Sequence, residues 1–173
     1  MKFFVLLFFA ITLLWADRSG GPYIGLGYAH SQLKEKGFFD LEDDGDSSLL
    51  FVAGAYINPY LSVEIEYTDL LSFKRNNGEN VEAKILDVNT QAHYAFFENR
   101  LDFFAKFGVG EIYKTQKGFT FVYGGGAAYR LNDRYALRIG YNYFDFGYDE
   151  NGDNSSDIDM GINQFYGVFE VQF

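Results

Sequence analysis

The sequence predicts an all-β protein, an eight-stranded antiparallel transmembrane up-and-down β-barrel, and three observations lead to this prediction. The composition favours strands, because 20% of the 173 residues are aromatic and the chain has 19 Gly but only 2 Pro. About eight stretches alternate between apolar and polar residues, with the roughly 9–11 residues that a tilted strand needs to cross a bilayer. Several of these stretches carry charged residues in their middle, and such residues can be accommodated on the inward face of a barrel.

The N-terminal residues have the layout of a secretory signal. Lys2 is followed by an apolar run over residues 3–15, and then by Ala16 and Asp17. The run is short of the roughly 20 residues that a spanning helix needs, so an export signal is favoured over an uncleaved anchor helix. We predict a signal peptide at residues 1–16 and a single barrel domain at residues 17–173.

Four of the predicted strands alternate regularly, and four are less regular but of similar length. The regular strands are residues 61–68, 87–96, 101–110 and 136–144. The others are residues 23–31, 49–57, 119–131 and 164–173. Short connections are expected at 58–60, near 98–99 and at 132–134, and longer polar ones at 33–48, 69–80 and 147–163, with a shorter one near 114–118. Short turns at one end and longer loops at the other are typical of an outer-membrane barrel.

The orientation of the two strand faces separates a membrane barrel from a soluble one. An eight-stranded barrel has an interior only just wide enough for side chains, so the many aromatic residues of the apolar face would overfill it. We therefore expect the aromatic face to contact lipid and the polar face to line the interior. The polar face carries Glu64, Glu66, Gln91, Lys106, Arg138 and Glu170.

The last ten residues, QFYGVFEVQF, are predicted to form the closing strand. A sheet in hydrocarbon leaves no backbone donor open, so the last strand has to pair fully with the first. One face of this strand points toward lipid and consists of Phe165, Gly167, Phe169, Val171 and Phe173.

These features together resemble the small outer-membrane barrels of the OmpA-like, OmpX/Ail-like and opacity-protein group. The resemblance covers the whole mature chain and is carried by YIGLGYAHS, NPYLSVEIEY, GGGAAYRLNDRYALRIGYNY and the final strand. It implies a monomer in the outer membrane of a Gram-negative bacterium with both termini in the periplasm. It also implies that the barrel-assembly machinery reads Phe165, Gly167, Phe169, Val171 and Phe173. The 173 residues do not include the peptidoglycan-binding domain of two-domain OmpA proteins, so the resemblance does not imply anchoring to the cell wall.

The same resemblance implies an ion-pair network in the lumen. A Glu after the NPY turn and an Arg in the seventh strand belong to this network in OmpA-type barrels, and they match Glu64 and Arg138. Lys106 matches another basic member, whereas a further acidic member falls on Ala128. Glu66 and Glu170 are the candidates to replace that acid. We expect the network to fill the lumen as a structural plug.

Several kinds of chemistry are excluded or disfavoured. The chain has no Cys, which excludes disulfides and thiolate sites, and its net charge of -10 argues against a nucleic-acid partner. His30 and Ser31 are neighbours on a strand and point to opposite faces, and His93 is expected to face the lumen. The segment 149–160 begins like a calcium-binding loop but lacks its Gly and its final Glu. We predict no catalytic residues, metal site or cofactor.

The predicted long loops contain both acidic and basic side chains. Acidic residues dominate residues 40–46 and 149–159, which indicates solvated loops. Seven of the 14 basic residues fall on the long-loop side, where phosphates of lipopolysaccharide would attract them. The candidates for this contact are Lys34, Lys36, Lys74, Arg75, Lys84, Lys114 and Lys117.

We therefore expect a non-enzymatic outer-membrane barrel that supports envelope integrity and displays acidic extracellular loops. The resemblance makes adhesion to a host or cell-surface ligand the most plausible specific activity, because loops on rigid barrels carry such functions. Two alternatives remain open at this point: an outer-membrane enzyme that modifies lipid A, and a secreted soluble carrier of lipocalin type.

Overall fold

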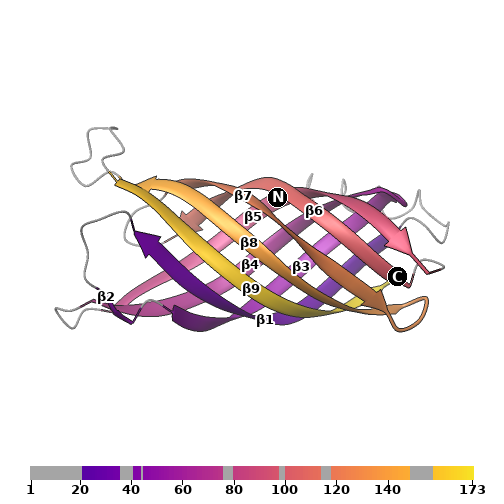
Figure 1. Ribbon diagram of the computed structural model, residues 1–173, viewed down its shortest axis with the longest axis horizontal. Coiled ribbons are helices and arrows are strands. Elements are labelled where there is room, and N and C mark those ends of the chain that lie inside the picture. The colour runs from indigo at the N-terminus through magenta and orange to yellow at the C-terminus, as the bar shows by residue number, and fades with distance from the viewer. Residues whose placement is uncertain are drawn as a thin grey trace, which may run out of the picture.

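The computed structural model describes residues 21–35, 41–43, 45–75, 80–97, 100–113, 118–148 and 158–173, and Figure 1 shows their strands winding obliquely around a common axis. Within these ranges, no helix is long and apolar enough to cross a membrane. The strands are β1 (Gly21–Glu35), β2 (Leu41–Asp43), β3 (Gly45–Asn58), β4 (Leu61–Arg75), β5 (Asn80–Phe96), β6 (Leu101–Tyr113), β7 (Gly118–Arg130), β8 (Tyr135–Tyr148) and β9 (Ile158–Gln172). The signal peptide predicted at residues 1–16 lies outside the described residues.

Eight of these strands form one closed antiparallel barrel. The strands pair in the order β4-β3-β1-β9-β8-β7-β6-β5, and a further pairing of β4 with β5 closes the ring. The short strand β2 adds to β4 through Leu41 and Asp43. The predicted fold class, an all-β eight-stranded antiparallel barrel, is therefore confirmed.

The first and last long strands make a full seam. β1 pairs with β9 from Tyr23, opposite Gln172, to Glu35, opposite Met160. Beyond the first of these pairs, the backbone N–H of Phe173 donates to the carbonyl of Pro22 at 3.0 Å. The seam leaves neither strand with an open edge, as hydrocarbon requires.

The short turns share one end of the barrel with Gly21 and Phe173, and we call it the short-turn end. Asn58 and Asn132 organise two of the turns through their side-chain oxygens. Asn58 accepts from the N–H of Tyr60 at 2.8 Å, and Asn132 accepts from those of Arg134 and Tyr135 at 2.9 Å each. The opposite end is the long-loop end.

The strands run further toward the long-loop end than the sequence predicted. Most of the predicted loop 69–80 is strand, because β4 continues to Arg75 and β5 begins at Asn80, with Lys74 opposite Asn80. Parts of the predicted loops 33–48 and 147–163 are likewise strand. The reason is that a β ladder is held by backbone hydrogen bonds, which continue through polar residues once the hairpin is aligned.

The outside of the barrel carries the apolar face of the strands. Large apolar side chains are exposed on every long strand, including Leu26 at 53%, Phe107 at 62% and Ile139 at 67%. A contiguous apolar surface of this extent on a closed sheet is what a membrane barrel presents to lipid.

The interior differs between the two ends. Toward the short-turn end it is filled mainly by charged and amide side chains. Toward the long-loop end it is mainly apolar and includes four small hydroxyl side chains, which are those of Ser31, Ser48, Thr68 and Thr120. The apolar members, all at most 8% exposed, are Leu50, Ile85, Ile112, Val122, Phe144 and Ile162. The expectation of a polar face along the whole interior was therefore incomplete.

Candidate functional site in the barrel interior

Strand alternation brings the charged residues of the sequence together inside the barrel. Glu64 and Glu66 are two apart on β4 and share its inward face, while their neighbours Val63 and Ile65 point outward. Lys106, Arg138 and Glu170 enter from β6, β8 and β9. None of the five charged side chains belongs to a residue more than 4% exposed.

Arg138 lies between two carboxylates. Its Nη1 is 2.6 Å from Glu64 Oε2, and its Nη2 forms an ion pair with Glu170. The guanidinium carbon also lies 5.1 Å from the ring centre of Phe104 and 5.4 Å from that of Tyr23. Such aromatic neighbours stabilise a desolvated cation.

Lys106 makes the second ionic centre. Its Nζ is 2.5 Å from Glu66 Oε2 and 3.6 Å from Glu64 Oε1, and it lies 5.1 Å from the ring centre of Tyr166. Glu64 therefore connects the two cations. The result is one continuous chain of charges across the lumen, from Glu66 to Glu170.

Neutral side chains supply further donors to the same carboxylates. Tyr23 Oη and Gln91 Nε2 donate to Glu64 at 3.0 and 2.6 Å, and Asn142 Nδ2 donates to Glu66 at 2.6 Å. A buried carboxylate is tolerated when it is paired and hydrogen-bonded in this way. Sequence reasoning identified the charged members but not Tyr23 and Asn142.

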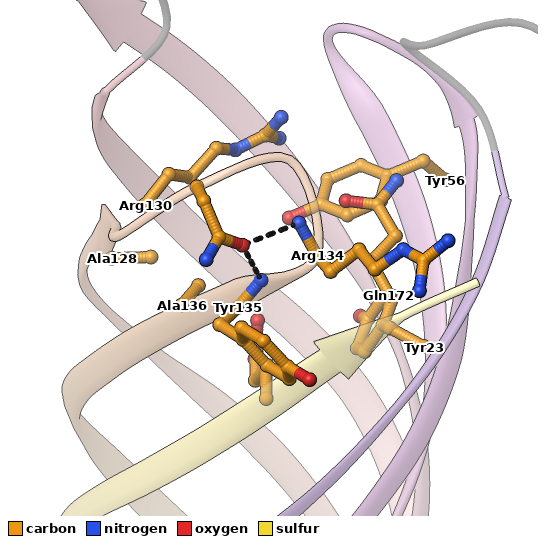
Figure 2. Close-up of a pocket in the computed structure, with 10 residues that line it drawn as sticks. Tyr23, Tyr56, Ala128, Arg130, Arg134, Tyr135, Ala136 and Gln172 are labelled. Atoms are coloured by element: carbon orange, nitrogen blue, oxygen red, sulfur yellow. Dashed lines mark hydrogen bonds between the residues drawn. The ribbon is translucent and has the colours of Figure 1, made fainter.

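The position Ala128, where OmpA-type barrels have an acid, carries no charge here. Ala128 lines a small pocket at the short-turn end, together with Tyr23, Tyr56 and the buried Glu170 (Figure 2). Arg134 is drawn among the lining residues, and Asn132 Oδ1 accepts from the backbone N–H groups of Arg134 and Tyr135. Of the two acids suggested as its replacement, Glu170 pairs with Arg138 and Glu66 pairs with Lys106.

A second polar chain lies near the short-turn end and includes His93. Ser62 Oγ is 2.8 Å from His93 Nε2, and His93 Nδ1 is 2.8 Å from Asp102 Oδ2. The order is that of a serine hydrolase triad, but the three residues are only 0, 6 and 2% exposed, respectively. The rings of Tyr56 and Phe104 lie 5.0 and 6.0 Å from the imidazole, leaving it packed between aromatic side chains.

Within the described ranges, the Ser62–His93–Asp102 chain is not accompanied by the backbone donors of an esterase site. Ser62 sits within the regular pairing of β3, β4 and β5, so no turn presents its hydroxyl beside free backbone N–H groups. His30 lies elsewhere, exposed on the outer face, whereas Ser31 is buried. Among the described residues, no group of three His, Asp or Glu side chains could hold a metal ion.

Only some of the residues predicted to contact lipopolysaccharide lie within the described ranges. Lys34 lies in β1 opposite Gly161, and Lys74 and Arg75 end β4. The exposed Lys84 forms an ion pair with Asp69 at 3.2 Å. Lys36, Lys114 and Lys117 lie outside the described residues.

The predicted assembly residues share the outward face of the last strand. Phe165, Phe169 and Phe173 are 59, 44 and 72% exposed. Gly167 and Val171 lie between them at alternate positions, with intermediate exposure. The arrangement gives this strand an aromatic stripe on the lipid-facing side.

Comparison with known proteins relates the whole barrel to one family. The family model of the outer membrane protein β-barrel domain matches residues 3–173. No curated protein matches the chain by sequence.

Among solved structures, OprG from Pseudomonas aeruginosa is 14% identical with a TM-score of 0.64, covering 90% of this chain and 97% of its own. Neisserial surface protein A is 14% identical with a TM-score of 0.58, covering 88% and 97%. Ail from Yersinia pestis, solved with the heparin analogue sucrose octasulfate, is 16% identical with a TM-score of 0.55, covering 88% and 99%. At these identities the likeness concerns the fold. The chain belongs to the family of outer membrane protein β-barrel domains.

Proposed function

We propose that this protein is a non-enzymatic outer-membrane barrel that supports envelope integrity and displays loops outside the cell. The observation that carries the proposal is the filled interior, in which ion pairs and apolar side chains occupy the lumen from one end to the other. A filled barrel is a rigid scaffold, and wide aqueous channels need about 16 strands. The apolar exterior also disfavours the soluble carrier, because a carrier of that kind would turn its apolar face inward.

The proposal includes an orientation in which both termini face the periplasm. Its support is the position of Gly21 and Phe173 at the short-turn end, since short turns are periplasmic in barrels of this class. The aromatic stripe of β9 would then lie at the inner rim as the signal for the barrel-assembly machinery. The protein would act as a monomer in contact with lipid and lipopolysaccharide.

Adhesion is the specific activity that we propose for the loops. Ail shows that a barrel of similar fold can be solved with a sulfated sugar bound. The net charge of -10 and the acidic segments near residues 40–46 and 149–159 disfavour a polyanion as the ligand of this chain. A neutral or basic cell-surface ligand is therefore expected.

Cell fractionation followed by loop deletion tests the proposal. The protein should sediment with outer membranes and migrate differently on a denaturing gel before and after boiling. Deletion of residues 149–157 should reduce attachment of cells while this shift remains. Replacement of the same residues by a neutral linker of equal length separates charge from length. Normal attachment in both variants would contradict the adhesive role and leave the barrel assignment intact.

The lipid-A-modifying enzyme is the competing hypothesis, and the Ser62–His93–Asp102 chain gives it a concrete form. Burial of all three residues argues against it, because a lipid substrate could not reach Ser62. The variant His93→Gln should therefore leave the mass of lipid A unchanged, as should His30→Gln. A change in lipid A mass in either variant would replace our proposal with the enzymatic one.

A further inference from the structure

Two buried acids lie side by side in the barrel interior. Asp87 on β5 is directly opposite Glu66 on β4, and neither residue is more than 1% exposed. Residues directly opposite on one face of an antiparallel pair have Cβ atoms about 4.5–5.5 Å apart, so the two carboxyl groups are neighbours. On the other side of β5, the residue opposite Asp87 is Gly110, which brings no charge. Two carboxyl groups at one buried site do not both ionise readily, because each negative charge disfavours the other.

The two acids differ in what they contact. Glu66 Oε2 is 2.5 Å from Lys106 Nζ, and Glu66 Oε1 accepts from Asn142 Nδ2 at 2.6 Å. Asp87 Oδ1 accepts from the neutral amide of Asn89 at 2.7 Å, whereas its Oδ2 has no hydrogen-bond partner among the described residues. These partners stabilise a negative charge on Glu66 far better than one on Asp87.

The charged groups that act most strongly on Asp87 belong to the ion-pair network, and they are Glu66, Lys106 and Glu64. Glu64 has a cation of its own, because Arg138 Nη1 lies 2.6 Å from its Oε2. Lys106 is therefore the buried cation that remains for Glu66 and Asp87 within the described ranges, and it pairs with Glu66. A negative charge on Asp87 would be left without a counter-ion, and a carboxyl group in that position binds a proton instead.

We propose that Asp87 is a neutral carboxylic acid in the folded barrel at neutral pH, so that the chain takes up one proton when the barrel forms. The proton resides on Oδ2, since Oδ1 already accepts from Asn89. Lys106 then balances Glu66 without competition from a second negative charge. In the unfolded chain the same side chain is ionised, because an aspartate in water has a pKa of about 3.9.

The proton on Asp87 makes the stability of the barrel depend on pH. Stability falls with rising pH wherever the folded state binds more protons than the unfolded chain. The contribution of Asp87 is complete below about pH 4, where both states bind the proton, and it is lost as the pH rises until the folded barrel also releases the proton. One buried acid thus links the stability of the barrel to the acidity of the compartment in which it folds.

Infrared spectroscopy of the folded barrel in detergent tests the protonation state of Asp87. A protonated carboxyl group absorbs at a carbonyl frequency distinct from those of amides and carboxylates. Wild-type protein at neutral pH should show this absorption, and Asp87→Asn, which has nearly the shape of the neutral acid, should lose it. The matched control Asp145→Asn removes an exposed acid and should keep it. Its absence from the wild type, or its persistence unchanged in Asp87→Asn, would overturn the proposal.

Urea unfolding at several pH values provides a second readout. Between about pH 5 and about pH 8, the ratio of folded to unfolded wild-type protein should fall relative to that of Asp87→Asn, by up to about tenfold per pH unit, the limit for one proton. Glu66→Gln removes the adjacent charge and frees Lys106, so its carboxylic acid absorption should disappear at a lower pH than in the wild type. An identical pH dependence of the wild type and Asp87→Asn would show that folding takes up no proton at Asp87.

Discussion

The two halves of the barrel interior are filled by different kinds of interaction. Near the short-turn end, the stability of the interior depends on specific ion pairs, such as those of Arg138 with Glu64 and Glu170. Near the long-loop end it depends on volume, because Leu50, Ile85 and Phe144 have no polar group to satisfy. The outward face is apolar along both halves. Lipid thus requires apolar side chains on the outward face of every strand. The inward-facing side chains can be ionic or apolar, provided that they fill the lumen.

The difference predicts how the two halves respond to substitution. Loss of one partner in the ionic half leaves a buried charge unpaired in surroundings of low dielectric constant. Loss of a methyl group in the apolar half leaves only a small cavity. Four substitutions test this contrast, from the largest expected effect to the smallest.

Arg138→Met is expected to have the largest effect. It leaves the carboxylates of Glu64 and Glu170 without their common partner, which should lower the free energy of unfolding by about 3–5 kcal/mol. Urea unfolding of the barrel in lipid vesicles measures the loss. The double variant with Glu64→Gln should lose less than the single variant, because one of the stranded charges is removed. Equal losses would count against the pairing.

Tyr23→Phe should have the next largest effect. It removes a donor to the charged Glu64, and hydrogen bonds to charged groups contribute about 1.5–3 kcal/mol. The matched control is Tyr28→Phe, since Tyr28 lies on the same strand but points outward and is 59% exposed. If both variants unfold at the same urea concentration, the Tyr23 hydroxyl contributes nothing to the network.

Ile85→Val probes the apolar half. Ile85 is fully buried, and removal of one methylene group from such a site costs about 0.5–1.5 kcal/mol. Its neighbour Leu86 points outward, and Leu86→Val should cost less because lipid chains fill the space. A larger loss for the outward substitution would show that the interior is loosely packed at this level.

Lys84→Ala should have the smallest effect. The ion pair between Lys84 and Asp69 is exposed on both sides, so water and salt screen it. The small difference between this variant and the wild type should disappear in concentrated sodium chloride. A difference that survives high salt would mean that Lys84 contributes through contacts of its stem. The Arg138→Met loss, by contrast, should change little with salt, because the buried charges are shielded from it.

The sequence predicted the barrel because its outward face obeys one rule. Lipid requires apolar side chains at every second position, so strands such as 61–68 and 101–110 alternate visibly. The ionic residues were identified for the same reason, since charges in mid-strand interrupt an otherwise apolar pattern. Their individual partners depend on which strands face each other across the lumen, and strand alternation does not contain that information.

The apolar half of the interior was missed for the opposite reason. Where both faces of a strand are apolar the alternation disappears, and the predicted strand 87–96 begins just after Ile85 and Leu86. Phe104 was missed as an interior residue because it follows Phe103 without a change of character. The hydrogen bond between His93 and Asp102 was also not anticipated, although both residues lay on predicted polar faces.

The seam between β1 and β9 has a consequence for the order of events during biogenesis. Tyr23 and Gln172 are neighbours in the ring, yet nearly the whole chain separates them, and such non-local contacts form slowly. Until β9 arrives, β1 and β8 each present an unpaired edge that the hydrocarbon does not tolerate. These two edges therefore have to be paired with each other, or covered by another protein, before they are exposed to hydrocarbon.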